Sequence, residues 1–265
     1  MYAFNYVKPA SLADAAAALS GAEDGTLLAG GQTLLPTMKQ RLASPSDLVD
    51  LSGIAELQGI SVGGGTVTIG AMSRHAAVAG SADVQAAIPA LAALAGGIGD
   101  QAVRNRGTLG GSVANNDPAA DYPAAVLGLG ATVKTTNREI AADDFFTGLF
   151  ETALMPGEIV TAVSFPQPQK AAYAKFPNPA SRYAMVGVFV AKFADGVRVA
   201  VTGAGDSGVF RVAAYESALA ANFSADAVPD GAVSADSLNS DLHADAEYRA
   251  HLIAVMTRRA VAAAG

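Results

Sequence analysis

The residues of this chain that could do chemistry are mainly glycines next to hydroxyl side chains. They gather in three stretches: LLAGGQTLLP at 27–36, NRGTLGGSVANNDPAAD at 105–121 and VAVTGAGDSG at 199–208. A glycine has no Cβ, so its backbone can approach a ligand closely, and successive N–H groups can surround an anion. Stretches of this kind are typical of sites that bind phosphate groups.

The third stretch is the best formal match to the dinucleotide-binding fingerprint. Gly203, Gly205 and Gly208 have the spacing G-x-G-x-x-G and follow a β-branched run. That fingerprint also needs a second strand ending in an acidic residue about 20 residues further on. The corresponding segment, ANFSADAVPDGAVSADS, is polar and has no strand pattern. We therefore expect a loop where a strand leaves a small antiparallel sheet for a helix, not a nucleotide site.

The first two stretches could hold one pyrophosphate between two loops. Thr33, Thr108 and Ser112 would add hydroxyl donors. The helix expected after the first stretch would add the positive end of its dipole. Taken alone, either stretch is more often a plain turn, so the residues by themselves leave both interpretations open.

Other reactive side chains are scarce. The chain contains no cysteine and only three histidines, His75, His243 and His251. The missing thiols exclude disulfides, Cys-ligated zinc, a thiol nucleophile and an iron–sulfur cluster on this chain. The histidines lack the spacing of a zinc site, and His75 has no evident catalytic partner, so we expect no metal site and no catalytic residue. Redox chemistry would need a bound organic cofactor or a partner chain.

Composition limits the partners and the compartment. The 265 residues are 51% hydrophobic and carry a net charge of −7, with no basic stripe that would indicate nucleic-acid binding. No apolar run reaches the roughly 18 to 20 residues of a membrane span, and the first residues lack a signal-peptide pattern. We therefore expect a cytoplasmic protein with no transmembrane segment.

The apolar pattern predicts three units that would position the glycine stretches. Residues 1–55 alternate strands and helices, which indicates an N-terminal α/β subdomain. Residues 56–166 begin with a hairpin at the Gly63-Gly64-Gly65 turn and form a second α/β subdomain. Residues 167–265 have the pattern of an antiparallel sheet followed by helices. The proline-rich run FPQPQKAAYAKFPNP interrupts the periodicity and suggests the boundary before this last unit.

Taken together, three segments resemble the FAD-binding medium subunit of the molybdenum hydroxylases, the family of carbon monoxide dehydrogenase and xanthine dehydrogenase. AGGQTLLPTMKQRLASPSDLVDL is similar to the family's first FAD segment, and VRNRGTLGGSVANNDPAADYPAA to its second. DLHADAEYRAHLIAVMTRRAV resembles its C-terminal helix. The resemblance implies an α+β fold, in which two α/β subdomains of the PCMH type clasp FAD and a C-terminal domain adds a small antiparallel sheet and helices.

The resemblance also implies which residues contact FAD. Residues around Gly30 and Gly31 would wrap the pyrophosphate, and an opposing loop would contain Gly110 and Gly111. Asn115 and Asp121 would reach ribityl or adenosine hydroxyls, although Asp121 also stands where a helix N-cap is expected. Apolar residues, a lysine and a tyrosine would lie near the flavin. The full set is Leu28, Ala29, Gly30, Gly31, Gln32, Thr33, Leu34, Leu35, Ile98, Thr108, Leu109, Gly110, Gly111, Ser112, Asn115, Asp121, Val160, Lys175 and Tyr183.

The function implied by the resemblance is electron transfer, with no catalytic residue on this chain. Substrate would be oxidised at a molybdopterin cofactor on a large subunit, and [2Fe–2S] clusters on a small subunit would carry the electrons to FAD and an external acceptor. The assembly would be a heterotrimer, paired into a dimer of heterotrimers. The alternatives are a self-sufficient flavin oxidoreductase of the same fold and a non-enzymatic scaffold protein.

Overall fold

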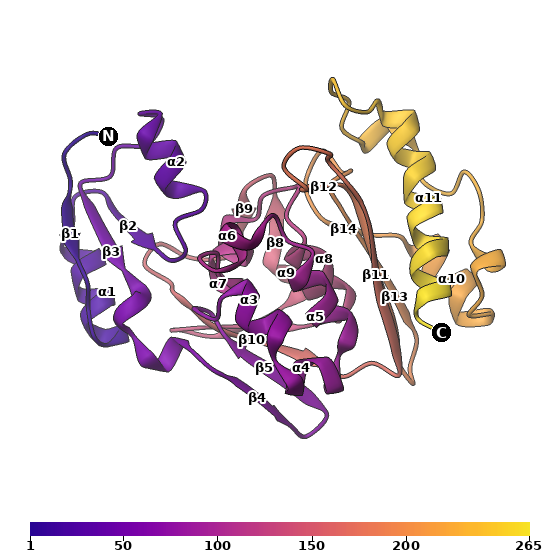
Figure 1. The fold of residues 1–265 in the computed structure, drawn as a ribbon, viewed down its shortest axis with the longest axis horizontal. Coiled ribbons are helices and arrows are strands. Elements are labelled where there is room, and N and C mark those ends of the chain that lie inside the picture. Colours follow the sequence, from indigo (N-terminus) through magenta and orange to yellow (C-terminus); the bar gives the residue numbers. More distant parts are fainter.

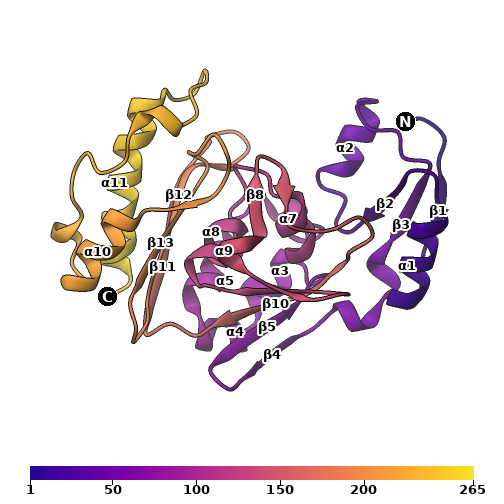
Figure 2. The ribbon, with the colours of Figure 1, turned by 180° about the vertical axis from the view of Figure 1, so that it is seen from behind.

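The computed structural model describes all 265 residues and has an α+β architecture built on three main sheets that lie side by side (Figure 1). A small N-terminal sheet stands at one end, and a larger sheet with a group of short helices occupies the middle. A third sheet follows at the other end, and the C-terminal helices cover its outer face (Figure 2). No helix combines the length and the apolar character that a membrane crossing would need.

The N-terminal sheet is parallel, with strand order β1-β3-β2. Ser11 caps its first helix by accepting a hydrogen bond from the backbone N–H of Asp14 at 3.1 Å. The second strand ends at Leu28, so the glycine pair lies beyond its carboxyl end. The elements are β1 (Asn5–Val7), α1 (Leu12–Gly21), β2 (Gly25–Leu28), α2 (Leu34–Lys39), β3 (Asp47–Asp50) and two 3₁₀ turns (Leu51–Gly53, Ala55–Leu57).

The middle sheet is antiparallel, with β10 at its centre between β5 and β6. Short helices gather on one of its faces (Figure 1) and enclose the largest core, which contains Tyr122, Phe145 and Phe165. The strands are β4 (Ile60–Gly63), β5 (Thr66–Gly70), β10 (Val160–Pro166), β6 (Thr132–Thr135) and β7 (Glu139–Ala141), and a separate hairpin pairs β8 (Phe146–Gly148) with β9 (Glu151–Thr152). The helices are α3 (His75–Gly80), α4 (Ala82–Ala87), α5 (Pro89–Gly96), α6 (Gln101–Arg104), α7 (Leu109–Asn115), α8 (Tyr122–Gly128) and α9 (Ala142–Phe145).

The third sheet is buried on both faces, since α5 and α8 pack on one side and α10 and α11 on the other. Arg249 ties α11 to this sheet, because its Nη1 donates to the carbonyl oxygens of Met185 at 2.6 Å and Gly203 at 3.0 Å. The elements are β11 (Lys170–Pro177), β12 (Ala184–Lys192), β13 (Val197–Thr202), β14 (Phe210–Arg211), α10 (Ala213–Ala221), two 3₁₀ turns (Ala225–Ala227, Ala235–Ser237) and α11 (Ala246–Ala263).

The fingerprint-like stretch VAVTGAGDSG lies in this third sheet. As predicted, it is where a strand leaves a small antiparallel sheet: β13 ends at Thr202, and a loop then returns through the short strand β14 to α10. Gly203 has φ +84°, and a Cβ there would collide with the carbonyl oxygen of Ala184. The strand packing alone therefore requires this glycine.

Two expectations about local structure are wrong. The opposing loop predicted around Gly110 and Gly111 is the first turn of helix α7, with Thr108 Oγ1 accepting from the N–H of Gly111 at 3.2 Å. Each of the two adjacent glycines destabilises a helix by roughly 1 kcal/mol relative to alanine, so the sequence pattern does not predict a helix here. The proline-rich run, expected only as a boundary, contains the eight-residue strand β11. β11 lies at a sheet edge, where proline is tolerated.

Candidate functional site

A cavity of about 900 Å³ lies between the N-terminal sheet and the helices of the middle sheet. It is lined by the segment after β2, the start of α3, the region from Ile98 to Asp121, the segment before β10, and Ser181 and Tyr183. Its size is at the upper end of the range usual for small-molecule sites, roughly 300 to 1,000 Å³. An elongated cofactor is therefore the kind of ligand that it fits.

Two glycines let the walls of this cavity meet backbone to backbone. A Cβ on Gly30 would lie 2.5 Å from the carbonyl oxygen of Arg106 and 2.7 Å from the Cα of Gly107. A Cβ on Gly110 would lie 2.5 Å from the Cβ of Ala71. These glycines are thus required by the contact between chain segments, which brings both glycine stretches to one cavity.

The first stretch presents backbone donors that no group in the protein uses. The N–H groups from Gly30 to Leu34 have no backbone or side-chain acceptor, although all these residues line the cavity. Gly31 has φ +71°, and the segment leads directly into α2. Successive unpaired N–H groups at such a turn form a concave site for an anion.

The second stretch differs, because its first donors are already taken. The N–H of Leu109 donates to the carbonyl oxygen of Ser73 at 3.0 Å, and that of Gly110 to Ala71 at 2.8 Å. The N–H of Gly111 is bound by the Thr108 hydroxyl. Besides a closely fitting wall, this stretch offers a ligand the Ser112 hydroxyl and the separate N–H groups of Thr108, Asp117 and Asp121, which have no acceptor in the protein.

Most residues that the resemblance implied surround this one cavity. Leu28 and Leu35 instead pack around Gly31, Leu109 is fully buried in the middle core, and Lys175 lies behind the cavity wall. Gly203 does not line the cavity. The implied residues that do are Ala29, Gly30, Gly31, Gln32, Thr33, Leu34, Ile98, Thr108, Gly110, Gly111, Ser112, Asn115, Asp121, Val160 and Tyr183.

Asp121 connects the cavity to Lys175. Its carboxylate makes no cap on α8; Oδ1 accepts from the Tyr173 hydroxyl at 2.6 Å and pairs with the Lys175 ammonium at 2.9 Å. Lys175 also donates to the carbonyl oxygens of Gly97 and Arg182, so its donors are occupied. Burial raises the pKa of Asp121, whereas the Lys175 charge and the Tyr173 hydrogen bond oppose that rise. Oδ2 has no partner in the protein.

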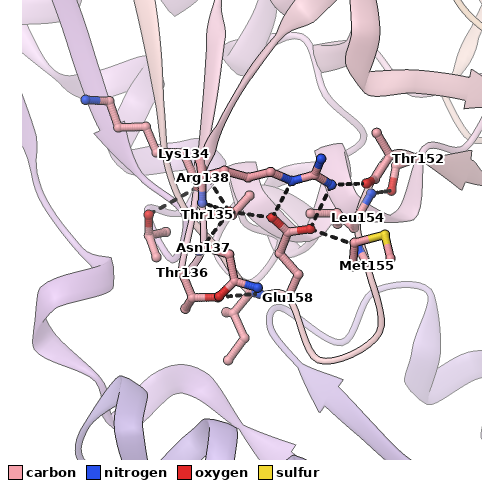
Figure 3. A network of polar contacts seen from close by, with 12 residues as sticks. Lys134, Thr135, Thr136, Asn137, Arg138, Thr152, Leu154, Met155 and Glu158 are labelled. Carbon is pink, nitrogen blue, oxygen red and sulfur yellow. Dashed lines mark hydrogen bonds and ion pairs between the residues drawn. The ribbon is translucent and has the colours of Figure 1, made fainter.

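Two residues that line the cavity could not be assigned to it from the sequence. Glu158 precedes β10, and its side chain is 0% exposed in a network with Arg138 (Figure 3). His75 begins α3, is 5% exposed and packs its ring 5.3 Å from that of Tyr122. Burial and the nearby charge of Arg104 lower the pKa of His75 to about 4, so the imidazole is neutral at neutral pH. Neither residue belongs to a motif, because its partners are distant in sequence.

The lining contains no lysine or arginine. An anionic ligand would therefore be held by N–H and hydroxyl donors, as glycine-rich nucleotide sites hold phosphates. Both buried carboxylates of the lining are paired with a cation behind the wall, Asp121 with Lys175 and Glu158 with Arg138. Together, the cavity, its unpaired donors and its neutralised carboxylates are the features expected of a site for a nucleotide cofactor.

Comparison with known proteins identifies the family. Residues 2–168 match the family described as FAD binding domain in molybdopterin dehydrogenase. The chain is 36% identical to the nicotine 6-hydroxylase medium subunit of Paenarthrobacter nicotinovorans, over 99% of this chain and 98% of that one. It is 35% identical to the carbon monoxide dehydrogenase medium chain of Afipia carboxidovorans, over 97% and 95%.

Solved structures agree with these matches. Reconstituted CO dehydrogenase from Oligotropha carboxidovorans superposes with a TM-score of 0.91 at 36% identity, covering 99% of this chain and 98% of that one. Quinoline 2-oxidoreductase from Pseudomonas putida 86 gives a TM-score of 0.90 at 31% identity, covering 99% and 97%. The chain belongs to the family of FAD-binding medium subunits of molybdenum hydroxylases. It is the flavoprotein component of such an oxidoreductase, and FAD is its cofactor.

Proposed function

We propose that this chain holds FAD in the cavity between its first two sheets and serves as the electron-transfer subunit of a molybdenum hydroxylase. The observation that carries the proposal is the run of unpaired N–H groups from Gly30 to Leu34. These donors lie within the part of the chain that matches the FAD-binding family. A diphosphate would satisfy donors that the protein leaves open.

Different residues would bind different parts of the cofactor. The diphosphate would be held by the N–H groups after Gly30 and by the Thr33 and Ser112 hydroxyls, which have no other hydrogen-bond acceptor. Asn115 and the free Oδ2 of Asp121 would accept from cofactor hydroxyls, and Ile98, Val160 and Tyr183 would enclose the flavin. FAD, when bound, supplies the redox chemistry; the chain binds it, orients it and excludes water.

The proposal places this chain between two redox partners. A small subunit with [2Fe–2S] clusters would supply electrons, and an external acceptor would remove them. Substrate would be oxidised on a large molybdopterin subunit, within a cytoplasmic dimer of heterotrimers. Support comes from the relatives, which are medium subunits or chains of oxidoreductases. We also propose that residues 1–55, 56–166 and 167–265 are three units, since each contains one main sheet.

The test is to purify the tagged chain from its native cells under gentle conditions. We expect a yellow preparation with flavin absorption and co-purification of one iron–sulfur and one molybdopterin subunit. Flavin with no partner chain would favour a self-sufficient flavin oxidoreductase and contradict the subunit role. A colourless chain that gains no flavin absorption on addition of FAD would contradict the whole proposal and favour a scaffold protein.

A further inference from the structure

One wall of the cavity is the short segment 153–160 between β9 and β10. Leu154, Gly157, Glu158, Ile159 and Val160 line the cavity from this segment. Only its last residue belongs to a strand of the middle sheet. Its shape is therefore set by side-chain contacts together with backbone hydrogen bonds outside the sheet, such as that from the N–H of Ala153 to the carbonyl oxygen of Phe145 at 2.8 Å.

The carboxylate of Glu158 is the centre of those contacts (Figure 3). Oε1 accepts from Arg138 Nε at 3.0 Å and from the Thr135 hydroxyl at 2.6 Å. Oε2 accepts from Arg138 Nη2 at 3.1 Å and from the N–H of Met155 at 2.8 Å. A buried carboxylate with this many donors stays ionised, and the Arg138 hydrogen bonds above all lower the pKa of Glu158 to about 2.

Arg138 reaches both ends of the segment. Besides its fork on Glu158, Nη2 donates to the carbonyl oxygen of Ala153 at 2.6 Å. The turn that carries Arg138 adds a second attachment, because Thr136 exchanges hydrogen bonds with Ile159 through its N–H at 2.9 Å and its hydroxyl at 3.2 Å. The segment is thus bound to the β6–β7 turn at its start, its middle and its end.

No second cation contacts Glu158. Lys134 on β6 pairs with Glu139 on β7 at 3.1 Å, and the other neighbours, Thr135 and Met155, are uncharged. The Arg138 side chain is 45% exposed, whereas that of Glu158 is 0% exposed. One half-exposed guanidinium therefore neutralises a carboxylate that is sealed inside the cavity wall.

We propose that Arg138 is a positioning residue for the FAD cavity, which holds segment 153–160 in its binding shape by bridging Glu158 and Ala153. The inference rests on the proposed function, in that FAD must occupy this cavity. Arg138 does not line the cavity and so acts through the wall. Without it, a buried carboxylate loses its only counter-ion, and the carbonyl oxygen of Ala153 loses the hydrogen bond that ties it to Glu158 through Arg138.

The test compares FAD binding by the purified assembly after flavin removal, with wild type, Arg138→Gln, Glu158→Gln and the double variant. The control is Arg211→Gln, because Arg211 makes a similar fork on Glu216, at 2.7 and 2.8 Å, away from this cavity. We expect Arg138→Gln to raise the Kd for FAD by about ten-fold to a hundred-fold, as for charged hydrogen bonds, and Arg211→Gln to change it by less than about two-fold. The double variant should bind FAD no more weakly than either single variant does.

A pH profile separates positioning from a general loss of stability. Once Arg138 is replaced, burial raises the pKa of Glu158, so its protonation in mildly acidic buffer removes the unpaired buried charge but does not restore the hydrogen bonds that Arg138 made. The loss of FAD affinity in Arg138→Gln relative to wild type should therefore shrink towards that of the double variant as the pH falls from 8 to 5, whereas the loss in the double variant should not change with pH. If Arg138→Gln does not accumulate, the double variant, which leaves no buried charge, must still show the deficit.

Opposite results have distinct meanings. Wild-type affinity in Arg138→Gln or in the double variant overturns the positioning role and leaves the proposed function standing. A loss of affinity in Arg138→Gln that disappears at pH 5 overturns it too, because it would show charge repulsion of the cofactor rather than a displaced wall. If the wild-type assembly does not take up FAD, the proposed function itself fails and this inference fails with it.

Discussion

At the scale of single residues, His75 sets an acid limit on the stability of the fold. The residue is 5% exposed, and its pKa is lowered to about 4, whereas an unfolded chain protonates histidine near pH 6.5. The unfolded state therefore binds more protons than the folded state below about pH 6.5. The stability that follows from the neutral ring is fully present above that pH and declines as the pH falls towards 4.

Replacing His75 with Gln should remove this acid sensitivity. Between pH 7 and pH 4, wild type should lose about 3 kcal/mol more of its free energy of unfolding than His75→Gln does, because the variant has no proton to take up. Urea denaturation of the apo chain at several pH values measures the difference. His251→Gln, which changes an exposed residue of α11, is the control and should follow wild type. Parallel pH curves for wild type and His75→Gln would contradict the prediction.

Most of the residues that the sequence predicted at the cofactor line the cavity, but the sequence did not indicate the partners of those residues. Gly30, Ser112 and Asp121 stand in recognisable segments, so their place at the cavity was predictable. Lys175 was expected beside the flavin, yet its ammonium is held by Asp121 and two carbonyl oxygens. The pairing depends on where β11 lies against α8, and no local pattern encodes that distance. The contact between Glu158 and Arg138 could not be predicted from the sequence for the same reason.

At the scale of elements, helix propensity and core packing predict opposite changes in stability when Gly110 is replaced by alanine. Alanine stabilises a helix by about 1 kcal/mol over glycine, so Gly110→Ala would strengthen α7 in isolation. In the protein, the new Cβ would lie 2.5 Å from the Cβ of Ala71. We expect a net loss of roughly 1 to 3 kcal/mol, together with weaker FAD binding as α7 is displaced from the cavity wall.

The control for that variant is Gly80→Ala, at the end of α3, where a Cβ would meet nothing within 4 Å. Denaturant unfolding of both variants should show Gly80→Ala equal to or more stable than wild type, and Gly110→Ala less stable. If Gly110→Ala proved as stable as Gly80→Ala, close packing would not be the reason for a glycine at that position.

The elements themselves were predictable where one pattern dominates. α1 has a capping residue and an alanine-rich body, and α5 has an apolar run with proline at its start. α7 was missed because its two glycines are poor helix formers, and its first turn is fixed instead by contacts with Ser73 and Ala71. β1 was missed because it has three exposed residues and obtains its order only by pairing with β3. Tertiary contacts decided both cases.

At the scale of the whole molecule, the cavity joins two of the three cores. The small core of the N-terminal sheet also contains Met72 and Ile159, which come from the middle part of the chain. The core of the middle sheet contains Phe189 and Ala200 from the third sheet. α10 and α11, in contrast, pack on the far face of that sheet, away from the cavity (Figure 2). Binding in the cavity should therefore tighten the first two parts and leave the outer helices unaffected.

Hydrogen exchange with and without FAD tests this arrangement and the choice between the glycine motifs. The N–H groups from Gly30 to Leu34 have no acceptor in the chain, so they should exchange fast without FAD and slow strongly when it binds. At a free FAD concentration 100 times Kd, linkage adds about 2.7 kcal/mol of protection to segments whose opening releases FAD. We expect protection in 29–34, 107–121 and 153–160, and no change in α11 or in 203–208. Protection at 203–208 with none at 29–34 would assign the nucleotide to the fingerprint-like loop instead.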